Sequence, residues 1–160
     1  MSEVAVEKPT ETRSLLKGLF AGLIGGLAGA AAKTVAEKIY PPRVHGEPEP
    51  SEVVIEKATD GEASDETKEI GAEAIHWAFG AMAGAAYGGL VEYYPAASSK
   101  EGASFGLTLA ALTHGGALPA MGLGAAPEDQ TAQEKTSEMS SHLVYGVVTE
   151  IVRGMVRKML

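Results

Sequence analysis

Residues 15–32 read LLKGLFAGLIGGLAGAAA, and no Asp, Glu, Lys or Arg occurs from residue 18 to residue 32. Four glycines recur along this stretch and fall on one helix face at about 100° per residue: Gly18, Gly22, Gly25 and Gly29. Glycine costs roughly 1 kcal/mol per residue in a helix in water, whereas membrane helices use it for close packing. The stretch therefore predicts a glycine-striped helix that spans a membrane.

Three further stretches of the chain also lack charged residues, at 74–91, 102–127 and 139–149. Spanning a bilayer takes about 20 mostly apolar residues, which the first two provide and the third approaches. A second glycine stripe lies within 74–91, at Gly80, Gly84 and Gly88. Two such stripes favour close pairing of helices inside a bilayer.

Together these patterns predict an all-α polytopic membrane protein, a four-helix transmembrane bundle with an acidic loop between its first and second helices. Prolines and changes in charge place the helices at 13–39, 66–94, 101–124 and 131–159. Residues 44–65 are expected to form an extended acidic loop and residues 1–12 a disordered tail, so that 13–160 make one membrane domain. Positive charges near the span ends slightly favour a cytoplasmic location for both termini.

Composition excludes several classes of protein. Thirteen basic against 21 acidic residues give a net charge of −8, which argues against a nucleic-acid partner. The chain has no cysteine, so disulfide scaffolds and thiol chemistry are excluded. A soluble bundle with buried Ala/Gly-rich helices remains an alternative, as does a secretory signal with a small-residue site at 28–32.

Ionisable residues at membrane depth are costly and therefore suggest function. His114 lies in the middle of 102–127. Three residues beside it predict a kinked or broken helix, since a proline leaves one helical carbonyl without its partner: Gly115, Gly116 and Pro119. A simple bend, with the histidine bonded to a neighbouring carbonyl, is the alternative.

The last predicted helix has one valine-rich face, expected to meet lipid, and one polar face, expected to meet the bundle. The candidates for a polar core or proton relay are His76, His114, His142, Glu150 and Arg153. An acid precedes a histidine by about one turn in both the second and the fourth helix, which suggests a metal site if these helices are neighbours. Its predicted ligands are Glu73, His76, Glu138 and His142.

Taken in order, these features resemble the YagU-like family of small bacterial inner-membrane proteins, over about residues 15–153. The matching residues are Pro41-Pro42-Arg43; His76, Tyr87, Glu92 and Pro95; Gly102, Phe105-Gly106-Leu107, His114, Pro119 and Gly122; and Glu138, His142, Tyr145, Glu150 and Arg153. The resemblance implies a multi-pass protein of the bacterial inner (cytoplasmic) membrane. It implies no particular chemistry, and the acidic insert at 43–69 departs from the family.

Three hypotheses for function follow. The first is a non-enzymatic membrane protein that responds to protons through its buried His and Glu residues. The second is a structural or assembly subunit whose glycine stripes pack against further copies or another membrane protein, and the third is the metal-binding bundle. Motifs for phosphate binding, a serine nucleophile or a zinc protease do not occur, so we expect neither an enzyme nor an organic cofactor. The partners expected are the lipid bilayer and a protein, not nucleic acid.

Overall fold

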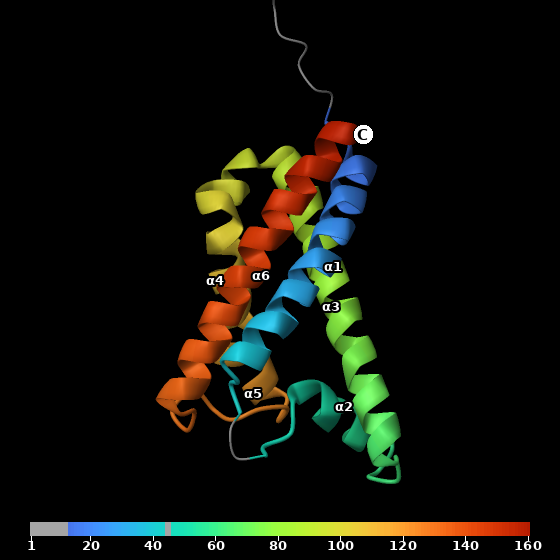
Figure 1. Cartoon of the computed structure of the whole chain (residues 1–160), viewed down its shortest axis with the longest axis vertical. Helices are drawn as coiled ribbons and strands as arrows, with labels where there is room; N and C mark the ends of the chain where they lie inside the picture. The colour runs from blue at the N-terminus through green and yellow to red at the C-terminus, as the bar shows by residue number, and fades with distance from the viewer. Residues whose placement is uncertain (1–12, 44–45) are drawn as a thin grey trace, which may run out of the picture.

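The computed structural model describes residues 13–43 and 46–160, and every regular element in these ranges is helical (Figure 1). Three helices are long: α1 (Leu15–Ile39), α3 (Asp65–Tyr93) and α6 (Ala132–Met159). The shorter elements are α2 (Pro50–Ala58), the 3₁₀ segment η1 (Pro95–Gly102), α4 (Ala103–Leu112), the π-helical turn η2 (Thr113–Ala117) and α5 (Leu118–Ala120). The all-α prediction is confirmed for the described residues, and the predicted tail at 1–12 lies outside them.

Helix α1 is the centre of the bundle, because it packs along both α3 and α6 (Figure 1). Helix α4 packs on α6 and also reaches α3, where the rings of Phe105 and Tyr87 stack with centroids 4.0 Å apart, and α2 packs on α3. Helices α3 and α6 diverge toward the end of the molecule where α2 and α5 lie. The two helix axes are therefore farther apart at this end of the bundle than at the other.

Glycines allow α1 and α3 to touch backbone to backbone. A Cβ built on Gly84 would lie 2.5 Å from the Gly22 carbonyl oxygen, and one built on Gly18 would lie 2.8 Å from that of Gly88. Gly26, which the stripe read from the sequence does not include, meets Gly80 in the same way. The two stripes are therefore occupied by contacts within one chain.

Glycines also allow α1 and α6 to touch backbone to backbone. The other two glycines of the α1 stripe face α6, where a Cβ on Gly25 would lie 2.5 Å from the Thr149 carbonyl oxygen and Gly29 meets Tyr145 and Thr149. The glycine stripe of α1 thus contacts two helices: Gly18 and Gly22 face α3, and Gly25 and Gly29 face α6.

Large apolar and small or polar side chains are distributed in an unusual way. The buried polar side chains lie on one face of α6, as its two-faced sequence predicts: Ser137, Glu138, Ser141, His142, Thr149 and Arg153. Many large apolar side chains are exposed instead, among them Leu16, Ile39, Met82, Leu112 and Met155. Apart from Tyr87, Val91 and Tyr145, the buried residues of the long helices are glycine, alanine and polar groups, and the exterior carries much of the apolar surface.

The extended loop predicted for 44–65 is wrong in part, since helix α2 occupies Pro50–Ala58. Proline at the start of the helix and a reciprocal capping box between Glu49 and Glu52 satisfy its first backbone groups. The side chain of Ile55 then packs on Gly71 of α3. This contact docks the short acidic helix on α3.

The third predicted helix is divided into α4, η2 and α5, so no single long helix covers 101–124. Among the described residues, α1 alone is both long and apolar enough to cross a membrane by length and composition. This is weak support for membrane association, because signal sequences and buried helices have the same properties. The structure does not confirm four membrane spans.

A charged clamp joins α3, α6 and the start of α1 at the end of the molecule opposite α2. The Arg157 guanidinium donates to both carboxylate oxygens of Glu92, from Nε to Oε2 at 2.9 Å and from Nη2 to Oε1 at 2.6 Å. The backbone N–H of Ser14 donates to the same carboxylate at 2.7 Å. These hydrogen bonds, the one from Arg157 first, hold the pKa of Glu92 below its usual range.

Replacing Gly84 by alanine is expected to lower the free energy of unfolding by about 1–3 kcal/mol, because the added methyl group meets α1 backbone that cannot move aside. Gly154→Ala is the matched control, since a Cβ there meets no atom within 4 Å. Thermal unfolding of the two purified variants measures the difference. Equal midpoints would show that the α1–α3 contact is not close-packed.

Glu92→Gln tests the clamp through its pH dependence. A carboxyl whose folded-state pKa is lowered adds stability above its unfolded pKa of about 4.3, and this stability is lost as pH falls through the lowered value. The melting-temperature gap between wild type and Glu92→Gln should therefore be constant near neutral pH and close in acid. A gap that persists unchanged to the lowest pH at which the protein folds would contradict the clamp.

Candidate functional site

Helix α6 places two ionisable side chains one turn apart on its buried face. Glu138 and His142 are 4 % and 5 % exposed at their side chains, and they lie at i and i+4. The small side chains of Ser137 and Ser141 on the same face let α6 come close to the end of α1. The Ser141 hydroxyl donates to Glu37 Oε1 at 3.1 Å, and that of Ser137 donates to the Tyr40 carbonyl.

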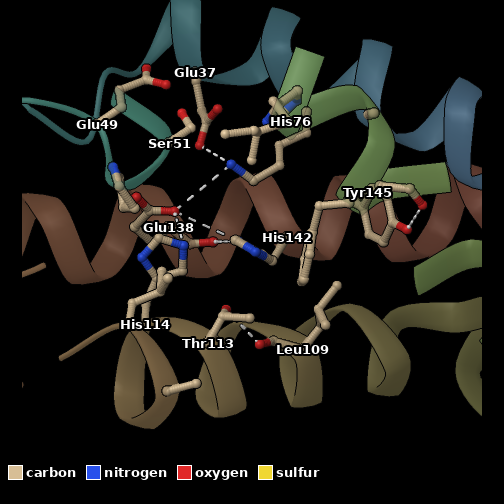
Figure 2. A pocket seen from close by; sticks show the side chains of 18 of the residues that line it. Glu37, Glu49, Ser51, His76, Leu109, Thr113, His114, Glu138, His142 and Tyr145 are labelled. Carbon is tan, nitrogen blue, oxygen red and sulfur yellow. Dashed lines mark hydrogen bonds and ion pairs between the residues drawn. The ribbon is translucent and has the colours of Figure 1, made fainter. Parts of the chain in front are cut away.

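Glu138 is the point at which three other segments of the chain meet (Figure 2). Arg43, four residues after the end of α1, donates from Nη2 to Oε1 at 2.9 Å. The other oxygen, Oε2, lies 3.1 Å from His114 Nε2 and 3.9 Å from the ammonium group of Lys33 on α1. One carboxylate thus connects α1, the segment after it, η2 and α6.

His114 reaches Glu138 because α4 changes its winding. The backbone N–H of Leu118 donates to the Thr113 carbonyl five residues earlier, which makes η2 a π-helical turn. Pro119 has no N–H for the Gly115 carbonyl, so the regular helix cannot simply continue there. The Gln130 side chain donates to the His114 carbonyl at 3.0 Å and fixes the turn. Single π-helical turns occur frequently at functional sites.

His142 is oriented by its own helix. Its Nδ1 lies 2.8 Å from the Glu138 carbonyl oxygen, and since a carbonyl only accepts, Nδ1 carries the hydrogen. The His114 and His142 rings meet edge to face, with centroids 5.1 Å apart. Both imidazoles are therefore held beside the same carboxylate.

The charges around the cluster balance. Lys33 pairs with Glu37 one turn along α1, and Arg43 pairs with Glu138. Two cations and two anions leave no net charge while the histidines are neutral. A charge-balanced group is much cheaper to bury than an isolated ion.

A cavity of about 220 Å³ opens beside these groups. Its polar wall is formed by the cluster together with His76 and Tyr145, and its apolar wall by α3 and α4–α5, with Ile75, Phe79 and Leu109. The start of α2, at Pro50 and Ser51, also lines the cavity. The cavity occupies the space that the divergence of α3 and α6 creates.

The structure brings together only part of each residue set that the sequence predicts. Of the predicted metal ligands, Glu138 and His142 lie together, whereas Glu73 accepts a hydrogen bond from Trp77 Nε1 at 2.7 Å and faces solvent. His76 Nε2 lies 3.3 Å from Thr34 Oγ1 and lines the same cavity outside the cluster. The four predicted ligands therefore do not form one group, because α3 and α6 diverge at this end (Figure 1).

The predicted proton-relay residues also divide into two groups. Glu150 and Arg153 form a bidentate ion pair, at 2.6 Å and 2.7 Å, and Tyr87 donates to Glu150 at 2.9 Å. These residues lie away from the cavity, whereas His76, His114 and His142 line it.

Three site residues were not among the candidates from sequence: Lys33, Glu37 and Arg43. A lysine and a glutamate at i and i+4 directly after a charge-free stretch were the available signal. Of the described residues, only His114, Glu138 and His142 form a group of metal-type donor atoms, all within 4.8 Å of one another.

The fold and the site define an all-helical bundle, packed through glycines, with a buried charged cluster and a cavity at one end. The model of one protein family, described as a protein of unknown function (DUF1440), matches residues 27–151. The chain therefore belongs to the DUF1440 family, which is consistent with the YagU-like resemblance. No curated protein and no solved structure matches it.

Glu138→Gln is expected to lower the free energy of unfolding by about 3 kcal/mol, because it leaves the largely buried Arg43 without its anion and gives the cluster a net positive charge. Glu69→Gln makes the same change at an exposed α3 position and should stay within about 0.5 kcal/mol of wild type. Thermal unfolding in one detergent compares them. Similar small effects in both variants would mean that Glu138 does not hold the segments together.

Proposed function

We propose that this chain is a multi-pass integral protein of the bacterial inner membrane that binds a small polar or ionic ligand in its cavity. The observation that carries the proposal is the inverted distribution of side chains. Polar groups line the inside of the bundle at α6, and large apolar groups cover its outside.

This distribution favours lipid as the surroundings. Soluble monomers rarely expose large contiguous apolar patches, and they bury charges only at a high cost. Here the exposed apolar side chains occur on all the long helices, for example Phe20 on α1, Met82 on α3 and Ile151 on α6. In a bilayer these side chains would contact lipid and would not need to be buried by another protein surface.

Lengths and glycine contacts agree with this arrangement. At about 1.5 Å per residue, α1, α3 and α6 are each long enough for a hydrocarbon core about 30 Å thick. Backbone contact through glycine is typical of packing between membrane helices. The broken segment α4–η2–α5 would be the fourth span, and irregular backbone within a membrane is tolerated where it lines a cavity.

Binding, rather than covalent catalysis, is the role that we assign to the cavity. Two hydroxyl groups on its wall are already engaged as donors to carbonyl oxygens, Thr113 to Leu109 at 2.7 Å and Tyr145 to Gly80 at 2.7 Å. Neither of these hydroxyls donates to a base, as an activated nucleophile would. The charged groups beside them can instead select and hold a ligand.

Cysteine labelling in native membranes tests the proposal, because the chain has no cysteine of its own. Thr113 lines the cavity, and its neighbour Leu112 is 64 % exposed on the outside of α4. With lipid outside, a small charged thiosulfonate should label Thr113→Cys and leave Leu112→Cys unlabelled. The reagent reaches only thiols that are in contact with water.

Comparing the labelling rates of Thr113→Cys and Leu112→Cys is decisive, because the two rates would change places if water rather than lipid surrounded the helices. In a soluble protein Leu112→Cys, the more exposed of the two, would react faster. Labelling both variants again after detergent denaturation shows that each thiol is reactive. Faster labelling of Leu112→Cys, or no labelling of Thr113→Cys before denaturation, would overturn the proposal.

A further inference from the structure

The cluster at the cavity wall has the composition and spacing of a metal site. We propose that His114, Glu138 and His142 bind one divalent transition-metal ion of the kind that prefers imidazole, such as Zn²⁺ or Co²⁺. This inference names the ligand of the cavity and so rests on the proposed function, although the binding chemistry itself does not require a membrane.

The distances suit a single ion. Two ligand atoms that each lie about 2.1 Å from a tetrahedral metal are separated by about 3.4 Å. His114 Nε2 lies 3.1 Å from Glu138 Oε2, and His142 Nδ1 lies 3.7 Å from the same oxygen (Figure 2). One donor atom from each of the three residues lies within 4.8 Å of the other two, so small side-chain rotations would bring all three within reach of one ion. Coordination through His142 Nδ1 would replace its hydrogen bond to the Glu138 carbonyl, and the hydrogen would then reside on Nε2.

An unsatisfied acceptor points to the same place. Glu138 Oε2 is buried and accepts no hydrogen bond, although His114 Nε2 is only 3.1 Å away. Arg43 occupies the other oxygen, Oε1, so it orients the carboxylate without satisfying Oε2. Buried polar atoms are nearly always satisfied, and a cation held between the three donor atoms would satisfy this one.

The types of donor define the class of ion. Two imidazoles and one carboxylate suit zinc, cobalt, nickel or iron, whereas Mg²⁺ and Ca²⁺ prefer sites built from several oxygen ligands. Three protein ligands leave a coordination position open, and the cavity has room for water there, since one water takes about 30 Å³ of liquid volume.

A neighbouring charge makes the proposal more specific. The Lys33 ammonium group lies 3.9 Å from Glu138 Oε2 and would repel a bound cation, even though it is paired with Glu37. Removing this positive charge should therefore tighten metal binding. A merely structural role for the cluster gives no reason for such an effect.

The experiment uses the full chain, purified in detergent, freed of metal with a chelator and titrated with Co²⁺ alone. Visible absorption of the bound cobalt should reach a plateau at one equivalent, and Zn²⁺ should displace it. His114→Ala and His142→Ala should each weaken Co²⁺ binding by about 100-fold or more. Replacing a residue that only supports a metal ligand already weakens binding by about 10–100-fold, and these variants remove a ligand itself. His76→Ala is the matched control, a histidine on the same cavity outside the cluster, and should bind like wild type.

Lys33→Gln is the second arm and should bind Co²⁺ more tightly than wild type. Melting temperatures of all variants show that each is folded. No saturable cobalt absorption in wild type, or equal losses in His76→Ala and His142→Ala, would overturn the metal site. That failure is separate from failure of the proposed function, since cysteine labelling does not depend on metal and cobalt binding does not depend on lipid.

Discussion

The rest of the structure depends on the direct approach of the α1 backbone to those of α3 and α6. Helices with ordinary side chains at their contacts stay about 8–10 Å apart, and glycine removes the atoms that keep them there. Because Gly25 and Gly29 bring α6 onto α1, the Lys33 and Glu37 side chains of the next turns of α1 reach the polar face of α6. The same contacts leave little space for apolar side chains inside the bundle, so those side chains lie outside. Close packing, the polar interior and the apolar surface are thus one property of the chain.

Much of this architecture can be predicted from the sequence, because the signals for it lie within each helix. Absence of charge and recurring glycine identify helices and their packing faces, and paired glycines before Pro119 indicate where a helix changes its winding. Pattern does not specify which helix meets which face. The α1 stripe serves two partners, and His142 meets His114 rather than His76, because the divergence of α3 from α6 is a tertiary property. The proton-responsive role and the assembly role suggested by the sequence stay predictions.

The acidic segment that contains α2 could not be predicted from the sequence in this way. The α2 sequence carries few helix signals beyond Pro50 and the glutamates around it, and its stability comes largely from docking on α3. The role of Arg43 is equally invisible in the sequence, because a basic residue after two prolines is ordinary at a helix end. Its partner Glu138 lies 95 residues away. Contacts of such separation are set by the fold and carry no periodic signal.

The π-helical turn has an evolutionary consequence. Such a turn amounts to one extra residue within an α-helix, and the segments before and after it keep the phase that the extra residue imposes. A deletion of one residue between Thr113 and Ala117 would remove this extra residue and shift the phase of the turn, while the contacts that α4 makes with α6 before the turn survived. His114 would then turn away from Glu138. Relatives of this chain could in this way lose the cluster in one step and retain the bundle, so the length of this turn, more than the identity of the histidine alone, is the trait by which to sort them.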